Sequence, residues 1–211
     1  KCADFCRYNA LAAVAGDVLV FPELCHGCGG CALVCPTSCI TAADRRIGVI
    51  REGRGHGVTL LQGLLDIGEP LAVPVVRSLR EKRQADGLTL VDCPPGTGCP
   101  MVRSVAGSDY CLLVAEPSPF GRHDLDLARL ACRELGVPHA AVINRASGND
   151  RIIEEYCVAE SIEVLGRIPY SREVAEKCSR GELLVGDGFW KGLFTGILEA
   201  VESRCLQTLQ S

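Results

Sequence analysis

Four cysteines at the spacing C-x2-C-x2-C-x3-C, followed at once by a proline, form the motif with the most specific chemistry in the sequence. A run of this kind lets three closely spaced thiolates hold one 4Fe-4S cluster while the fourth reaches a neighbouring cluster. A structural zinc site is the alternative, but such sites usually pair two short cysteine knuckles across a longer loop. The spacing therefore predicts a 4Fe-4S cluster, and the residues of the run are Cys25, Cys28, Cys31, Cys35 and Pro36.

Glycines lie between the cysteines of this run, at Gly27, Gly29 and Gly30. Because glycine adopts backbone conformations that other residues avoid, these positions let the loop close tightly and point its N–H groups at the sulfurs. Such N–H groups stabilise the negative charge of a cluster. His26 also lies between two cysteines, and we expect it to be a surface residue near the cluster rather than a ligand.

An earlier pair, Cys2 and Cys6, has the spacing C-x3-C and matches the second half of a ferredoxin run. Arg7 stands where many ferredoxins have a proline. Because the fourth cysteine of each run serves the other cluster, we expect one complete cluster site and half of a second one. Cys35 and Cys2 belong to the half site, and Cys39 is a nearby thiol with no place in the pattern. The complete site consists of Cys6, Cys25, Cys28 and Cys31.

A second candidate site follows the apolar segment LTLV at 88–91, which we expect to be a strand. Asp92 comes directly after it, and a glycine-rich turn with Gly96, Thr97 and Gly98 comes next. A carboxylate at the end of a parallel strand can hold the Mg²⁺ shell of a nucleotide, and N–H groups of such a turn can bind its γ-phosphate. The alternative is that Asp92 only forms a turn or caps a helix.

Several motifs, in order along the chain, resemble those of MinD/Mrp-type P-loop ATPases that carry an inserted ferredoxin domain. They are DCPPGTGCP at 92–100, GSDY at 107–110, EPSPFG at 116–121 and VINR at 142–145. The resemblance implies that Asp92 positions Mg²⁺ and water and that the loop at 96–98 senses the γ-phosphate of ATP. It further implies that Asn144 contacts the adenine edge, helped by Arg145 and the loop at Pro169, in a homodimer that binds ATP and Mg²⁺.

The departure from that family is large, because the sequence contains no G-x4-G-K-[ST] motif. Its lysines are Lys1, Lys82, Lys177 and Lys191, and its single methionine is Met101. We therefore expect a fragment whose phosphate-binding loop, together with the first two cysteines of the earlier run, lies before Lys1. Such a chain is not expected to bind or hydrolyse ATP well on its own.

The cysteine motifs and the resemblance together predict an iron-sulfur and nucleotide-binding ATPase that couples ATP binding or hydrolysis to electron transfer through 4Fe-4S clusters. Two alternatives stay open. One is a carrier or assembly scaffold that delivers labile clusters to apo iron-sulfur client proteins. The other is a non-enzymatic electron-transfer module whose α/β part only docks a redox partner.

The elements that must position these residues change in character near residue 45. We expect a partial, ferredoxin-like iron-sulfur insert at 1–45 and an α/β domain at 46–211, with a mostly parallel sheet flanked by helices, like an incomplete P-loop NTPase. Expected strands are 47–51, 58–65, 88–91, 110–115, 140–143 and 163–165. Expected helices are 72–85, 100–106, 123–135, 150–160, 171–179 and 189–207.

The expected helix at 189–207 carries an apolar stripe at helical spacing. Its polar face holds few cations, so we expect the stripe to pack against the sheet rather than to bind a membrane. The stripe consists of Trp190, Leu193, Phe194, Ile197, Leu198, Val201 and Cys205.

Fourteen cysteines among 211 residues are too many to be incidental. Seven lie in the first 39 residues, whereas the others are scattered among apolar segments where we expect small buried side chains, including Cys93 and Cys99. With no secretory signal, this distribution favours thiolate ligands in a reducing cytoplasm over a disulfide framework. A net charge of −4 argues against nucleic acid as a partner, and no apolar run is long enough for membrane insertion, so we expect a soluble protein.

Overall fold

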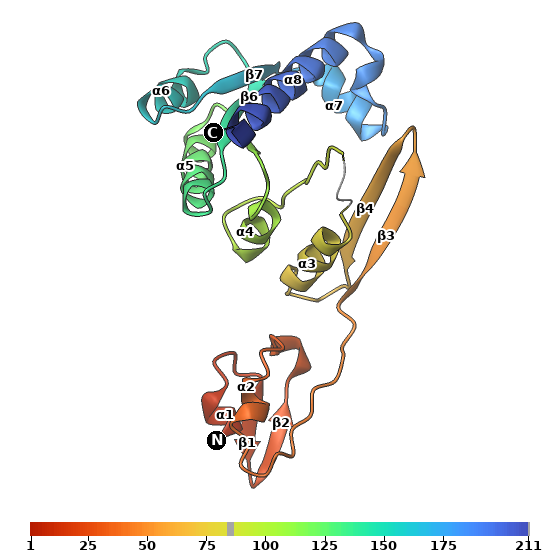
Figure 1. Ribbon diagram of the computed structural model, residues 1–211, viewed down its shortest axis with the longest axis vertical. Coiled ribbons are helices and arrows are strands. Elements are labelled where there is room, and N and C mark those ends of the chain that lie inside the picture. The colour runs from red at the N-terminus through yellow and green to blue at the C-terminus, as the bar shows by residue number, and fades with distance from the viewer. Residues whose placement is uncertain (84–86, 211) are drawn as a thin grey trace. The chain divides into compact units, whose positions relative to one another are not determined.

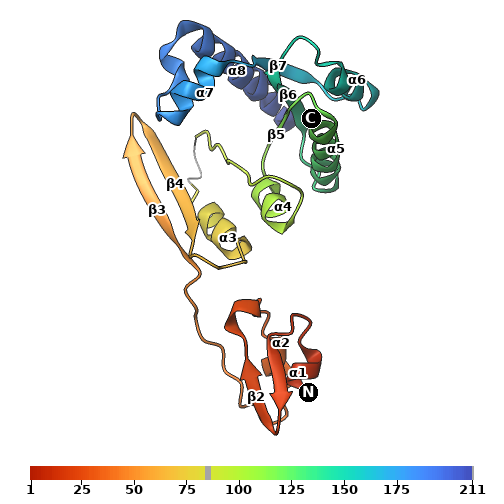
Figure 2. The same ribbon diagram turned by 180° about the vertical axis from the view of Figure 1, so that it is seen from behind.

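The computed structural model describes residues 1–83 and 87–210, and for 206–210 it describes the backbone alone. The chain divides into two compact units, Lys1–Thr89 and Leu90–Ser211. Figure 1 labels most helices and strands of both units, and Figure 2 labels β5 as well. The first unit contains the cysteine-rich segment and the elements of residues 46–83, and the domain boundary near residue 45 stays a prediction.

The cysteine-rich segment folds into short elements only. In chain order they are α1 (Cys2–Phe5), the antiparallel strands β1 (Leu11–Val14) and β2 (Asp17–Val20), the 3-10 helix η1 (Pro22–Leu24) and α2 (Gly30–Leu33). The hairpin turns at Ala15 and Gly16, which both have positive φ, at 51° and 94°. Positive φ at both central residues is the geometry of a tight two-residue turn that matches the twist of the strands.

Helices α1 and α2 pack against each other and so connect the two cysteine motifs. The ring of Phe5 fills the space beside Gly30, because a Cβ built at position 30 would lie 2.5 Å from a ring carbon. A side chain at position 30 therefore fits only if the ring of Phe5 moves, which favours a glycine there for steric reasons.

Residues 46–83 form a long antiparallel hairpin, β3 (Gly48–Gly55) and β4 (Val58–Leu65), against which α3 (Val73–Glu81) packs (Figures 1 and 2). Both strands lie where the sequence predicts strands, but the expectation that they belong to a parallel sheet is wrong. Only His56 and Gly57 separate them, with φ of 51° and 77°. A two-residue turn reverses the chain, whereas parallel neighbours need a connection of about a dozen residues or more.

A three-stranded parallel sheet in the order β5-β6-β7 is the centre of the C-terminal unit. Its strands are β5 (Cys111–Ala115), β6 (His139–Ala146) and β7 (Val164–Pro169). Helix α5 (Pro119–Glu134) connects the first two strands and α6 (Arg151–Ala159) connects the second pair. This alternation confirms the expected α/β class with a parallel sheet flanked by helices.

The remaining helices lie on either side of this βαβαβ segment in the sequence. Helix α4 (Cys99–Val105) precedes it, and α7 (Arg172–Ser179), η2 (Leu184–Gly186) and α8 (Gly188–Gln210) follow it. Helix α4 is short because Pro100 at its start and Gly107 after its end both favour a boundary.

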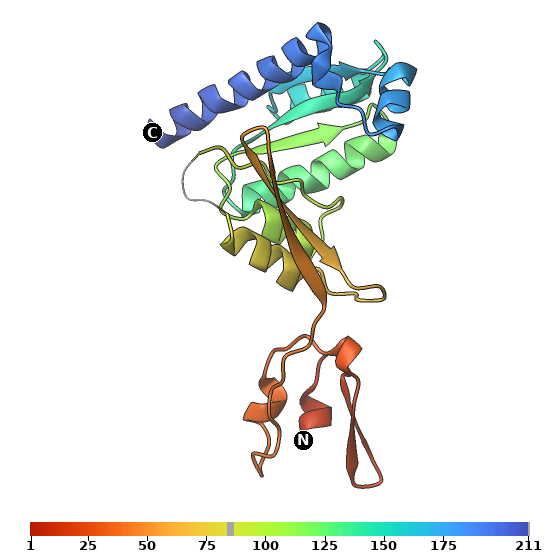
Figure 3. The same cartoon turned by 90° about the vertical axis from the view of Figure 1, so that its right-hand side faces the viewer.

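Helices cover both faces of the parallel sheet, with α5 on one side and α8 on the other (Figure 3). The main core lies on the α5 side, where Cys132 and Ile153 of α5 and α6 pack with Ile143 of β6, each 0% exposed. On the other side Ile197 of α8 lies against Gly166 of β7, where a Cβ would come within 2.8 Å of the isoleucine side chain. All seven residues of the apolar stripe in α8 are buried or half-buried, which confirms that the stripe packs inside the protein.

The strand predicted at 88–91 is not formed, and residues 87–98 contain no helix or strand. Three large apolar side chains in this segment, Leu88, Leu90 and Val91, are 60%, 79% and 46% exposed. An extended apolar segment becomes a strand only when a neighbour pairs with its backbone and covers its side chains, and this segment has neither.

No helix in the described part of the chain combines the length and the apolar character needed to cross a bilayer.

Candidate iron-sulfur site

The seven thiols of residues 1–39 all lie at or near the surface. Cys2, Cys6, Cys31 and Cys35 are half-buried, Cys25, Cys28 and Cys39 are exposed, and none of the seven is in a disulfide. Short helices position two of these cysteines. Helix α1 carries Cys2, α2 carries Cys31, and the two helices pack together. Exposed free thiols are available to ionise and to bind metal, whereas thiols in an apolar core are not.

The loop between the first cysteines of the run has the backbone that the sequence predicts. Gly27 and Gly29 have positive φ, at 64° and 72°. The N–H of Gly27 donates a hydrogen bond to Sγ of Cys25 over 3.4 Å. The expectation that these glycines point N–H groups at sulfur is confirmed at this position.

The ring of His26 stacks on the ring of Tyr8, with centroids 3.7 Å apart and planes inclined by 11°. Both residues are exposed, as expected for His26. The stack joins the loop of the second cysteine motif to the segment that follows Cys6. Sequence reasoning missed this contact, because nothing in residues 18 positions apart signals that their rings meet.

Cys35 and Cys39 are in contact through their sulfurs, which lie 3.5 Å apart. Between them, the hydroxyl of Thr37 donates to Sγ of Cys39 over 3.3 Å and lies 3.5 Å from Sγ of Cys35. When Cys35 is a thiolate, the Thr37 hydroxyl can turn to donate to it instead. That hydrogen bond is the largest cause that lowers the pKa of Cys35 to about 6, and backbone hydrogen bonds at Cys39 and Thr37 add to it. A thiolate is therefore favoured at position 35.

The donor set fits a 4Fe-4S cluster by its chemistry, since six thiols at ferredoxin spacing are accessible and at least one favours the thiolate. Their side chains are not drawn together: within residues 1–83 and 87–210, no three metal-ligating side chains converge closely enough to hold a metal ion. The assignment of Cys6, Cys25, Cys28 and Cys31 to one cluster, and of Cys2 and Cys35 to another, stays a prediction from spacing.

The residues predicted to contact a nucleotide base are gathered at one edge of the parallel sheet. Asn144 and Arg145 lie near the carboxyl end of β6. Pro169, the last residue of β7, pairs with Ala146, the last residue of β6. Arg145 has φ of 55° and its guanidinium lies 3.2 Å from the carboxylate of Glu116, which follows β5. In open α/β sheets, ligands bind at this carboxyl edge.

The residues predicted to bind Mg²⁺ and phosphate lie in or next to an irregular, exposed segment and not at the edge of the parallel sheet. Asp92 follows no strand, because the segment before it is irregular, and its side chain is exposed. Gly96, Thr97 and Gly98 are exposed as well, and Gly98 is the N-cap of α4. The interpretation of Asp92 as a carboxylate at the end of a parallel strand is therefore wrong for this structure, and the missing strand is the reason.

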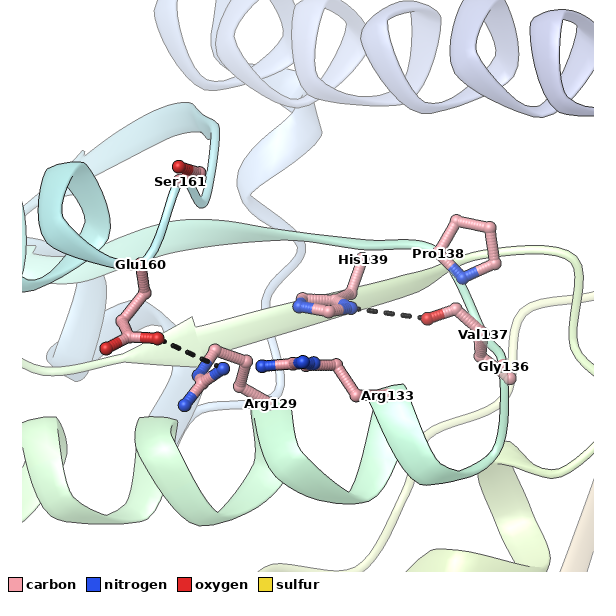
Figure 4. Close-up of a pocket in the computed structure, with 8 residues that line it drawn as sticks. All are labelled: Arg129, Arg133, Gly136, Val137, Pro138, His139, Glu160 and Ser161. Atoms are coloured by element: carbon pink, nitrogen blue, oxygen red, sulfur yellow. Dashed lines mark hydrogen bonds and ion pairs between the residues drawn. The ribbon is translucent and has the colours of Figure 1, made fainter.

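A cavity of about 450 Å³ lies at the opposite, amino end of β6 and includes none of the predicted site residues. Figure 4 shows Arg129 and Arg133 extending from α5 beside His139, with Glu160 at the end of α6. Arg129 is almost fully buried and is held by Glu160 at 3.1 Å and Asp126 at 2.9 Å. Its charge is thus already compensated, and the cluster ties α5 to α6.

Comparisons with known proteins agree with the cysteine motif. A family model described as "4Fe-4S binding domain" matches residues 18–41. This range contains the complete C-x2-C-x2-C-x3-C run, so the chain carries an iron-sulfur binding domain of ferredoxin type there. The match concerns the cluster alone, and nucleotide binding stays a prediction.

Two relatives come from Methanocaldococcus jannaschii. The chain is 32% identical to uncharacterized protein MJ0579 over an alignment of 174 residues that covers 75% of this chain and 63% of that protein. It is 34% identical to uncharacterized protein MJ0578 over 126 residues, which are 59% of this chain and 44% of that protein. The chain therefore spans less than two thirds of the length of each of these relatives.

Proposed function

We propose that the protein carries electrons through a 4Fe-4S cluster held by Cys6, Cys25, Cys28 and Cys31. The observation that carries this proposal is the match of residues 18–41 to a 4Fe-4S binding domain. A bound cluster of this type supplies reversible one-electron transfer. Zinc would use the same thiolates but could not change oxidation state, and its sites rarely have this spacing.

The chain's own groups favour a reducible centre close to the surface. The N–H of Gly27 points at Sγ of Cys25, and such hydrogen bonds to sulfur stabilise added negative charge. Cys25 and Cys28 are exposed, so a partner protein can approach the centre closely. The stack of Tyr8 on His26 holds the loop that carries these two cysteines.

Anaerobic reconstitution with iron and sulfide tests the proposal. We expect about four iron and four sulfide per chain, broad absorbance near 400 nm, and an electron paramagnetic resonance signal that appears on reduction and disappears on reoxidation. Cys28→Ser removes a proposed ligand and should lose most of the iron, whereas the matched control Cys178→Ser, an exposed thiol of α7, should retain it.

Two results would overturn this proposal. A colourless protein with one tightly bound zinc would assign the thiolates to a structural site. A cluster that leaves for an apo-ferredoxin faster than it can be cycled through reduction and reoxidation would assign the chain to cluster delivery.

A nucleotide site at the carboxyl edge of the parallel sheet is the second candidate function. It is supported by the gathering of Asn144, Arg145 and Pro169 at that edge and by the resemblance to MinD/Mrp-type ATPases. Calorimetric titration with ATP and Mg²⁺ tests it. We expect weak binding that Arg145→Ala reduces several-fold and that the control Arg151→Ala, an exposed residue at the start of α6, does not change. No binding at millimolar ATP would rule out this candidate for the chain.

A further inference from the structure

We propose that Cys35 and Cys39 form a disulfide that decides whether Cys35 is available as a cluster ligand. This inference rests on the proposed function, because it takes Cys35 to be a ligand of the half site. It gives a role to Cys39, which the cysteine pattern leaves unused.

The geometry that points to this pair is the contact between its two sulfurs. They lie 3.5 Å apart, and a disulfide bond is about 2.05 Å long, so the sulfurs need to approach by about 1.5 Å. Both thiols belong to one short segment without helix or strand. Backbone hydrogen bonds hold Cys35 to Ala32 and Ser38, but rotation of the cysteine side chains can bring the sulfurs together without breaking them. Cys39 is exposed and Cys35 is half-buried, which leaves the pair open to an oxidant.

Thr37 holds the two sulfurs on one side of this segment. Its hydroxyl donates to Sγ of Cys39 and lies within 3.5 Å of Sγ of Cys35, so one side chain contacts both. The contact therefore has a specific support in addition to the short separation of the two cysteines in sequence.

A second pair of cysteines shows why exposure matters. Cys111 and Cys132 of the C-terminal unit also interact through their side chains, but Cys132 is 0% exposed in the main core. A dissolved oxidant cannot reach it while the unit stays folded. Cys35 and Cys39, by comparison, have sulfurs in contact and are also accessible to a dissolved oxidant.

The oxidant we assign is a low-molecular-weight disulfide such as glutathione disulfide. The Cys35 thiolate attacks one of its sulfurs, which forms a mixed disulfide and releases one glutathione thiolate. Cys39 then loses its proton and attacks the Cys35 sulfur, which releases the second glutathione thiolate. Two protein thiols are oxidised, one glutathione disulfide is reduced to two glutathione thiols, and no other electron donor or acceptor is needed.

The consequence is confined to the half site. Oxidation removes Cys35 from the pair that it forms with Cys2, whereas Cys6, Cys25, Cys28 and Cys31 keep their thiols. Reduction by a dithiol restores Cys35. The segment thus links ligand availability at one cluster site to the thiol–disulfide balance around the protein.

Peptide mapping of the full, iron-free chain tests the disulfide. The chain is incubated without oxygen in glutathione disulfide, quenched in acid, alkylated, digested and sequenced by electron-transfer fragmentation. We expect a disulfide between Cys35 and Cys39 as the main product. Cys39→Ser should instead hold a stable glutathione adduct at Cys35, and Cys178→Ser should behave like the parent chain. Alkylation of both thiols, or pairing of Cys35 with another cysteine, would overturn the proposal.

Iron content separates failure of the inference from failure of the proposed function. A reconstituted chain treated in the same way should form the disulfide and keep about four iron, because the complete site does not use Cys35. Loss of that iron on oxidation would overturn the assignment of Cys35 to the half site. A reduced chain that takes up no iron would reject the proposed function, while the peptide map still decides on the disulfide.

Discussion

The cysteines of the two units differ in their surroundings although their side chains are the same. The seven cysteines of residues 1–39 are exposed or half-buried, whereas Cys132 and Cys157 of the C-terminal unit are 0% and 1% exposed. One cysteine of each set shows the contrast in acidity: hydrogen bonding lowers the pKa of Cys35 to about 6, whereas burial raises the pKa of Cys157. The first set is suited to metal and redox chemistry, and the second behaves as small apolar packing groups.

This difference shows that a cysteine count alone does not classify a protein. The expectation that cysteines beyond residue 45 are core residues holds for Cys132 and Cys157 but fails for Cys99 and Cys178, which are exposed. Cys99 is the first residue of α4 and Cys178 lies near the end of α7, where one helical face is in solvent. Spacing distinguishes ligands from other cysteines better than number does.

Thiol labelling should reveal the largest contrast between the two sets. In the iron-free chain, we expect iodoacetamide to label Cys25 and Cys28 at the rate of a free thiol. Cys132 and Cys157 should react at least about a thousandfold more slowly, because they become accessible only when the unit opens. Mass spectrometry of digests at successive times measures both rates. Equal labelling of Cys132 and Cys28 in the absence of denaturant would contradict the comparison.

Cysteine-to-serine substitution should also distinguish the buried from the exposed cysteines, by their effect on the free energy of unfolding. We expect this contrast to be smaller than the contrast in labelling rates. Cys157→Ser places a hydroxyl in the core, so we expect the free energy of unfolding of the iron-free chain to fall by about 1–3 kcal/mol. Cys28→Ser changes an exposed side chain and should alter it by less than about 0.5 kcal/mol. Urea unfolding followed by circular dichroism measures both changes. A larger loss for Cys28→Ser would show that the exposed thiols also stabilise the fold.

The pH dependence of Cys35 should give the smallest effect. With a pKa of about 6, its thiolate fraction rises as the pH passes through 6 and is nearly complete at pH 7.4. Thr37→Val removes the hydroxyl that is the largest cause of the shift, so its pKa should rise and alkylation at pH 7 should slow several-fold. Alkylation rates measured between pH 5 and pH 9 in the Cys39→Ser variant report the ionisation of Cys35 alone, because the neighbouring thiol is absent. Identical profiles with and without Thr37 would contradict this cause.

The sequence predicted much of the C-terminal unit because its periodic signals are strong. The strands of the parallel sheet and the helices between them differ from prediction by a few residues at most ends, and in the first unit the strand at 58–65 has the predicted bounds. The stripe on α8 was predictable from helical spacing alone. The strand at 88–91 was not predictable in the same way, because an apolar segment becomes a strand only if a neighbour pairs with it.

For the candidate site, the motif was predictable and its contacts were not. The C-x2-C-x2-C-x3-C run and its glycines follow from spacing, and a 4Fe-4S family match and the Gly27 hydrogen bond agree with it. The stack of Tyr8 on His26 and the contact of Cys35 with Cys39 depend on how the loops fold, and no pattern encodes them. Sequence reasoning named Cys39 only as a nearby thiol, and it missed the contacts of Tyr8 and Thr37 because these arise from the folded structure.

The packing of Phe5 on Gly30 also limits how this segment can evolve. A Cβ at position 30 would lie 2.5 Å from a carbon of the Phe5 ring, so that ring has to turn away before a side chain fits there. A mutation at position 30 is therefore better tolerated when position 5 carries a smaller side chain, so the effects of mutations at the two positions depend on each other. The pair ties the mutational histories of the two cysteine motifs together, because each motif contains one of the two residues.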